Sequence, residues 1–203
     1  LRDLSTSLAV IGNMKPSSGT FDRVSLWKHS FATAAASRTI ESRLAGTGES
    51  EIFVSGLLAN IGRVILDQFF KSECEEVCAY AEKEGIPVLQ AEKQVLGVTH
   101  ADIGYWAVMT WGLNTSVANT IRNHHGPKPD RQSCIVNLAY VSAQAFEIGS
   151  SGEKTLTPLI PGCLKTLRLT NDQLPGLIAS IENEFNTIDP LIKQLTEPEE
   201  KEE

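Results

Sequence analysis

The hydrophobic residues of this chain recur at steps of three and four residues, which is the spacing of one face of an α-helix. The clearest stretch is Ser55–Phe70, in which an apolar stripe is formed by Leu57, Leu58, Ile61, Ile65 and Phe69. Further apolar residues widen this stripe, and a helix that is apolar around most of its circumference is buried. The pattern therefore predicts one continuous, largely buried helix around which the rest of the chain packs.

Similar patterns, bounded by glycine, proline and N-capping residues, predict helices on both sides of this one. They cover Leu1–Lys15, Ser25–Leu44, a continuation from Phe70 to Lys83, Val88–Leu96, His100–Trp111, a helix from Asn114 to the histidine pair at 124–125, Gln132–Ile148 and a last helix from Thr170 to about Leu195. No alternating run is long enough to predict a strand. The fold class predicted from the pattern is all-α.

Three helix ends are predicted from capping chemistry. Gly85 and Gly97 are expected as C-caps, because glycine adopts the left-handed conformation at little cost. Thr99 is expected as the N-cap of the helix that begins at His100, with Asp102 at the third position of a capping box.

Composition narrows the classes of protein without naming one. A chain of 203 residues can bury one full core. Its formal net charge of -7 argues against a nucleic-acid-binding surface, and no apolar run approaches the length of a membrane span. The four cysteines form no Cys-x-x-Cys pair, so we expect reduced thiols in a cytosolic protein rather than a zinc site or a disulfide framework.

Residues 56–62, Gly-Leu-Leu-Ala-Asn-Ile-Gly, resemble the Gly-Leu-Leu-His-Asp-Ile-Gly signature of HD-type metal phosphohydrolases. Four histidines, which are all that the chain has, match histidine positions of that superfamily: His29, His100, His124 and His125. Residues 111–113, Trp-Gly-Leu, resemble a Trp-Gly-Leu-Pro turn of one branch, and Glu92 and Gly97 fit the same branch. The chain thus resembles the HD-related output domain (HDOD) family, a degenerate branch of the HD and HD-GYP phosphohydrolases.

This resemblance implies a helical scaffold whose hydrolase site is lost. An intact site holds one or two divalent metals that polarise a phosphoryl group and activate water. Here Ala59 replaces a histidine, Asn60 offers only a neutral amide oxygen, and Tyr140 stands where the hydrolases carry a late aspartate. We therefore expect no catalytic residue, no bound metal and no other cofactor. The vestigial site positions are His29, Ala59, Asn60, His100, His124, His125 and Tyr140.

Two interpretations of the remaining histidines stay open. They can be hydrogen-bonded core and helix-end residues, or they can line a vestigial anion pocket together with Arg122. His124 and His125 are expected at an exposed helix C-terminus, where the helix dipole favours their charged form and their charge changes near physiological pH. At least two of the three tryptophans are expected in the core.

The domain organisation predicted from the resemblance is an HD-like domain over residues 1–150 without the family's N-terminal helical half. A C-terminal extension over residues 151–203 adds a helix and a frayed acidic tail. Because the chain starts at Leu1 rather than at methionine, one interpretation is a trimmed fragment.

The predicted function is that of a non-catalytic bacterial signalling module in the cytoplasm. It is expected to bind a protein partner or another signalling domain, with no nucleic acid and no membrane as partner. One alternative is a metal-dependent phosphohydrolase or cyclic-dinucleotide phosphodiesterase with an unorthodox site. Another is a sensor that binds a small anionic ligand in a cavity where His29, Ala59, His100 and His124 meet.

Overall fold

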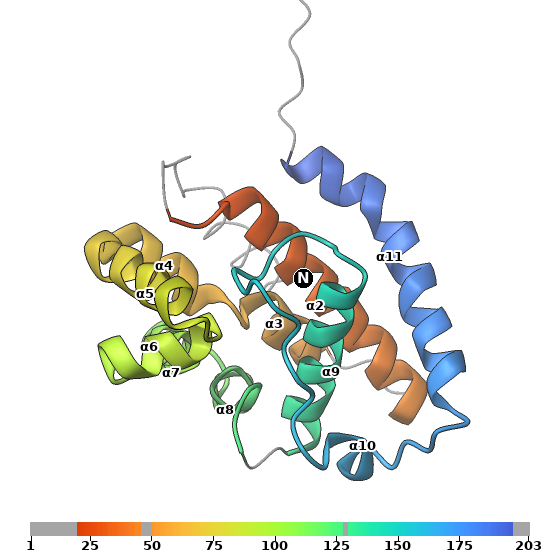
Figure 1. Ribbon diagram of the computed structural model, residues 1–203. Helices are drawn as coiled ribbons and strands as arrows, with labels where there is room; N and C mark the ends of the chain where they lie inside the picture. Colours follow the sequence, from red (N-terminus) through yellow and green to blue (C-terminus); the bar gives the residue numbers. More distant parts are fainter. Residues whose placement is uncertain (1–19, 46–49, 128–129, 197–203) are drawn as a thin grey trace, which may run out of the picture.

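The computed structural model describes residues 20–45, 50–127 and 130–196, and all regular elements in these ranges are α-helices (Figure 1). The predicted all-α fold class is confirmed for this part of the chain. The predicted helix Leu1–Lys15 and the acidic tail beyond residue 196 lie outside the described residues.

The described helices follow one another with short connections, except for the long segment between α9 and α10. They are α2 (Arg23–Ala45), α3 (Ser50–Leu58), α4 (Ile61–Phe69), α5 (Lys71–Glu84), α6 (Val88–Leu96), α7 (His100–Thr110), α8 (Thr115–Asn123), α9 (Arg131–Ala145), α10 (Cys163–Thr166) and α11 (Leu174–Thr196). Most agree with the predicted helices to within a few residues, and the bounds of α6 agree at both ends.

The capping predictions are confirmed. Gly85 ends α5 with φ of 64° and Gly97 ends α6 with φ of 74°, both in the left-handed region that glycine adopts without strain. Thr99 accepts a hydrogen bond from the backbone N–H of Asp102, whose side chain in turn accepts one from the backbone N–H of Thr99. This reciprocal cap fixes the start of α7, and with it the position of His100.

The prediction of one continuous helix over Ser55–Phe70 is wrong. The helix ends at Leu58, a buried turn of Ala59 and Asn60 follows, and a second helix starts at Ile61. The turn lets α3 pack against α2 and α8 while α4 packs against α7. The predicted buried face also ends early, because Phe69 is exposed where α4 meets α5.

Residues 51–69 are long and apolar enough to cross a membrane by length and composition alone. However, 78% of the window tested is buried inside the protein, and the turn at Ala59 and Asn60 divides it. Both observations identify the stretch as part of the core.

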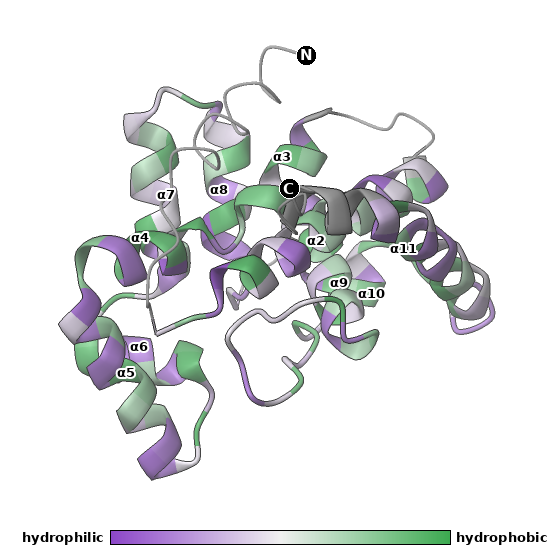
Figure 2. Ribbon diagram, turned by 90° about the horizontal axis from the view of Figure 1, so that it is seen from above, coloured by the Kyte–Doolittle hydropathy of each residue, from purple (hydrophilic) through white to green (hydrophobic). Residues whose placement is uncertain are grey.

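The hydrophobic core contains residues from both ends of the described chain, from α2 near its start and from α11 at its end. Its largest cluster lies between α2, α9, α10 and α11, and a second lies between α3, α4, α7 and α8. Along α11, residues at four- and three-residue steps enter the first cluster, namely Leu177, Ile181, Phe185 and Ile188. Figure 2 shows hydrophobic and hydrophilic residues side by side along this helix. Residues after 150 therefore complete the core of the helices before them.

The first testable prediction concerns Leu58, which is 2% exposed in the second cluster. Replacing it with alanine removes buried methyl groups and leaves a cavity, so the free energy of unfolding should fall by about 2–5 kcal/mol. Urea unfolding followed by circular dichroism measures this. Leu156→Ala is the matched control, because Leu156 is 59% exposed and should change stability little. Equal effects of the two changes would show that Leu58 is not a core residue.

Candidate functional site

Four histidines from three parts of the chain meet inside the protein. His29 comes from α2, His100 is the first residue of α7, and His124 and His125 directly follow α8. His29, His100 and His124 are fully buried, and His125 is half-buried. The ring centroid of His125 lies 3.9 Å from that of His124 and 5.3 Å from that of His100.

Two of these rings are held by hydrogen bonds on their Nδ1 side. His124 Nδ1 lies 2.6 Å from the carbonyl oxygen of Ile121, which can only accept, so Nδ1 carries the proton. His100 Nδ1 lies 2.7 Å from the carboxylate of Glu92, which also accepts the backbone N–H of His100. The side chain of Asn137 on α9 donates to the carbonyl oxygen of His124 and fixes the end of α8.

Tyr140 fills the space beside the histidines. It is fully buried on α9, and its ring centroid lies 4.6 Å from that of His29, 4.9 Å from that of His125 and 5.7 Å from that of His124. Burial raises the pKa of Tyr140, so its hydroxyl is neutral at physiological pH. The position where the resemblance places a ligating aspartate thus holds a neutral aromatic ring.

Ala59 and Asn60 form the turn that leads into the helix contacting His100. Both are fully buried, and neither side-chain atom of the Asn60 amide has a hydrogen-bond partner within the protein. A Cβ atom built on Gly62, two residues later, would lie 1.9 Å from the carbonyl oxygen of His100. Glycine at this position is therefore what allows the turn to approach α7.

Arg63 is the functional candidate that the sequence analysis missed. It is fully buried on α4, where its guanidinium lies 3.0 Å from Glu92 Oε1, 2.5 Å from Glu153 Oε1 and within hydrogen-bonding distance of the carbonyl oxygen of Ser151. Burial alone would lower the pKa of Arg63, but the charge of Glu92 and the other acidic neighbours raises it. The signal in the sequence that could have identified it is a single arginine within the apolar run that forms α4.

The same carboxylate connects the arginine to the histidines. Burial opposes ionisation of Glu92, but the charges of His100 and Arg63 and hydrogen bonds from His100 outweigh burial and lower the pKa of Glu92 to about 2. Glu92 is thus ionised near neutral pH and bonds both partners at once.

Arg122 does not belong to this cluster, so that part of the predicted anion pocket is wrong. Its side chain is 49% exposed, pairs with Asp102 at 3.3 Å and lies over the ring of Tyr105. The guanidinium inside the protein is that of Arg63, and two carboxylates already neutralise it.

The expectation of exposed, titrating histidines at the end of α8 is also wrong. Burial, followed by the positive charge of neighbours, lowers the pKa of His124 to about 3 and that of His125 well below its usual value. Burial and the charge of Arg63 likewise lower the pKa of His29 to about 3. In this environment desolvation outweighs the helix dipole, and these three rings are neutral near pH 7.

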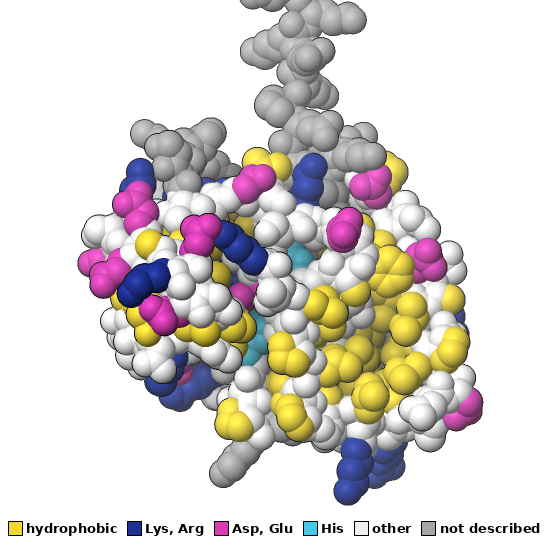
Figure 3. All heavy atoms as spheres, in the orientation of Figure 1, with side chains coloured by type: hydrophobic (Ala, Val, Ile, Leu, Met, Phe, Trp, Pro, Cys, Tyr) yellow, Lys and Arg dark blue, Asp and Glu magenta, His cyan; other side chains and the backbone are white. Residues whose placement is uncertain are grey.

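A groove of about 270 Å³ reaches the cluster from outside at His125. Its other walls come from the segment at 153–161, from Pro87 to Gln90 and from the Gly126-Pro127 turn. Histidine atoms are visible in the hollow on the face shown in Figure 3, beside a broad hydrophobic area. The four residues predicted to line a ligand cavity, His29, Ala59, His100 and His124, are instead fully buried.

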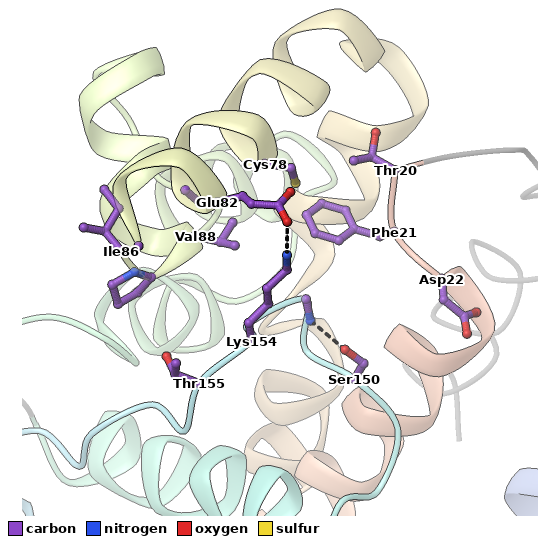
Figure 4. A pocket seen from close by; sticks show the side chains of 14 residues that line it. Thr20, Phe21, Asp22, Cys78, Glu82, Ile86, Val88, Ser150, Lys154 and Thr155 are labelled. Carbon is purple, nitrogen blue, oxygen red and sulfur yellow. Dashed lines mark hydrogen bonds and ion pairs between the residues drawn. The ribbon is translucent and has the colours of Figure 1, made fainter.

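A larger cavity of about 520 Å³ lies apart from the histidines, between α5, the segment at 150–155 and residues 20–22. Phe21, Cys78 and Val88 contribute to its walls, and Lys154 pairs with Glu82 at 3.1 Å (Figure 4). No feature of the vestigial site lines it.

The prediction that at least two tryptophans lie in the core is wrong. Trp106 is 49% exposed and Trp111 is 44% exposed, while Trp27 is half-buried. Trp106 and Trp111 lie five residues apart in the sequence, and that spacing alone did not predict whether either ring faces the core.

Comparison with known proteins gives a consistent picture. The family model for the HDOD domain matches residues 1–127 of this chain, and no curated protein matches it. The fold is similar to that of an HDOD domain protein of unknown function from Geobacter sulfurreducens, with 23% identity, a TM-score of 0.68 and coverage of 97% of this chain and 70% of that one.

Two further solved structures share the fold. One, from Shewanella amazonensis, is described as a candidate phosphohydrolase, with 20% identity, a TM-score of 0.61 and coverage of 91% of this chain and 71% of that one. Another, from Marinobacter aquaeolei, is described as a candidate signal transduction protein, with 18% identity, a TM-score of 0.72 and coverage of 96% of this chain and 44% of that one. At these identities the likeness shows the fold alone.

Proposed function

The chain belongs to the HDOD family, and from that membership we propose that it is a non-catalytic regulatory module of bacterial signal transduction. It acts in the cytoplasm by binding a protein partner or another signalling domain. The description of the Marinobacter aquaeolei protein as a candidate signal transduction protein supports this reading.

The observation that carries the proposal is that the carboxylates beside the histidines are already engaged in ion pairs and hydrogen bonds. Glu92 and Glu153 both bond Arg63, and Glu92 also bonds His100. Neither has a free oxygen pair to bridge two metal ions, as a two-metal hydrolytic site requires. Asn60 and Tyr140 supply no carboxylate in their place, so the scaffold supports binding better than phosphoryl chemistry.

The small-anion alternative has weaker support. An anion needs an uncompensated cation or free N–H donors, and the guanidinium of Arg63 already bonds two carboxylates and a carbonyl. The three histidines with lowered pKa values are neutral near pH 7. Protein contact is therefore the mode of action that we propose.

A hydrolase remains the second candidate, because the Shewanella amazonensis protein of similar fold is described as a candidate phosphohydrolase. The two proposals differ in whether the purified protein hydrolyses a phosphate ester. Purified protein supplied in turn with Mg²⁺, Mn²⁺, Fe²⁺ and Zn²⁺ should hydrolyse neither phosphomonoesters nor cyclic dinucleotides. Turnover proportional to protein concentration, and absent from an Asn60→Ala variant, would overturn the non-catalytic proposal.

A second prediction concerns restoring the lost ligands. The double variant Ala59→His with Asn60→Asp should remain inactive as a phosphodiesterase, because Tyr140 still occupies the position of a further ligand. Metal affinity depends on the full ligand set, so only the addition of Tyr140→Asp completes it. Activity assays with a chromogenic phosphodiester compare the double and triple variants. Phosphodiesterase activity in the double variant would show that Tyr140 is not the missing ligand position.

A further inference from the structure

Two cysteines that are far apart in the sequence meet inside the protein. Cys134 lies on α9 and Cys163 is the first residue of α10, and their Sγ atoms lie 2.7 Å apart. Both side chains are buried, and both are free thiols. A disulfide bond is about 2.0 Å long, so the two sulfur atoms need to approach by less than about 1 Å to form one.

The pair continues a row of contacts that holds one segment along α9. The side chain of Gln144 accepts the backbone N–H of Thr157, and that of Asn137 accepts the backbone N–H of Ile160. The cysteine pair follows in the same direction along both partners. The segment at 157–163 thus runs back along α9, and the two thiols are the contact in this row that can become covalent.

The loop between the two cysteines contains one wall of the groove at His125. Residues 155–161 and Glu153 line this groove, and Glu153 also bonds the buried Arg63. A covalent bond between α9 and α10 would fix the far end of the wall, which hydrogen bonds alone leave free to open.

We propose that Cys134 and Cys163 form a reversible disulfide bond by exchange with a low-molecular-weight disulfide of the glutathione class. One thiolate of the pair attacks a sulfur of the oxidised reagent, which breaks the S–S bond of the reagent and releases one reduced thiol. The second thiolate attacks the resulting mixed disulfide and releases the other thiol. The chain loses two electrons and two protons, and the reagent gains them as it becomes two thiols. The reduced thiols expected from the sequence are the state before this exchange.

The reagent reaches the pair through α10. Burial raises the pKa of both thiols, so they are protonated and unreactive while α10 is in place. However, α10 spans only Cys163–Thr166 and packs against α9, and Gly162 and Lys165 on either side of the thiol are exposed. A short surface helix with few buried contacts opens at low free energy, and its opening uncovers the pair.

This inference goes beyond the proposed function and does not depend on it, because a binding module and a hydrolase on this scaffold would carry the same two thiols. The test incubates the folded, reduced full chain with mixtures of reduced and oxidised glutathione, quenches with acid and maps tryptic peptides without reduction. Trypsin cuts after Arg131, Lys154 and Lys165, so the expected disulfide joins peptides 132–154 and 155–165.

The disulfide should also stabilise the folded state, because it closes a loop in the unfolded chain. The melting temperature should rise by about 5–15 °C on oxidation. By the same linkage, the folded chain should hold the disulfide at a glutathione ratio, [GSH]²/[GSSG], at least about 30-fold more reducing than the urea-unfolded chain does. Amide hydrogen exchange of residues 153–161 should slow on oxidation.

Cys163→Ser should lose the crosslink, the rise in melting temperature and the change in hydrogen exchange. The matched control is Cys78→Ser, which alters a half-buried thiol outside the pair and should keep all three. If Cys163→Ser does not fold, Cys134→Ala takes its place, and the peptide map of the unchanged chain decides by itself. Glutathione attached to Cys78 without the crosslink, a crosslink that forms only in urea, or a crosslink that leaves the melting temperature unchanged overturns the inference.

Discussion

Replacing Arg63 with methionine should lower the free energy of unfolding by about 3–5 kcal/mol at pH 7. The change leaves two buried carboxylates, Glu92 and Glu153, without their cation, and breaking a buried ion pair by removing one partner typically costs this much. Urea unfolding at constant ionic strength measures it. Arg122→Met is the matched control, because the exposed pair with Asp102 should contribute less than about 1 kcal/mol.

The pH dependence of the same variant tests the cause of this loss. The pKa of Glu92 is about 2 in the folded protein against 4.5 for the free group, so its stabilising contribution is present above pH 4.5 and is lost as the pH falls toward 2. The stability difference between the unchanged protein and Arg63→Met should therefore shrink over that window. A difference that stays constant from pH 5 to pH 3 would show that lost packing, rather than charge, explains the effect.

Gly62→Ala should destabilise the protein by about 3 kcal/mol or more, although alanine favours helices over glycine by about 1 kcal/mol. The new Cβ would lie 1.9 Å from the carbonyl oxygen of His100 and 2.7 Å from its carbonyl carbon. Both are backbone atoms at the start of α7, so no rotamer change relieves the contact, and α4 and α7 must separate. The position of His100 in the histidine cluster would then be lost as well.

Gly176→Ala is the control for helix propensity. Gly176 lies in α11, and a Cβ atom there would meet nothing within 4 Å, so the change should be neutral or stabilise by up to about 1 kcal/mol. Thermal melts of the two variants give the comparison. A Gly62→Ala protein as stable as the unchanged chain would rule out the close crossing of α4 and α7.

Sequence reasoning predicted the helices well because their ends carry local chemistry. Thr99 with Asp102, and the glycines at 85 and 97, mark caps that depend only on neighbouring residues. The turn at Ala59 and Asn60 carries no such mark. Since α3 is apolar on most sides, the hydrophobic pattern that runs from it into α4 has no change of face at residues 59–60 that could reveal the break.

The candidate site was predictable only in part. The resemblance pointed to the histidines and Tyr140, but their burial depends on residues far away in sequence. Glu153 and the segment that follows it contribute to the groove and to the ion pair of Arg63, and that region carries no recognisable motif. The protonation state of His124 could not be inferred from its helix-end position alone, because it depends on this tertiary cover.

The contacts of Arg63 also bear on how the chain folds as it is made. Its partners Glu92 and Glu153 follow 29 and 90 residues later in the sequence. At about 5–20 residues per second, synthesis of the 90 residues from Arg63 to Glu153 takes roughly 5–18 s, so α4 is made that long before its last countercharge. Until residue 153 has emerged, the nascent chain cannot bury Arg63 together with both of its native countercharges. Closure of the core around α4 is therefore a late step of biosynthesis.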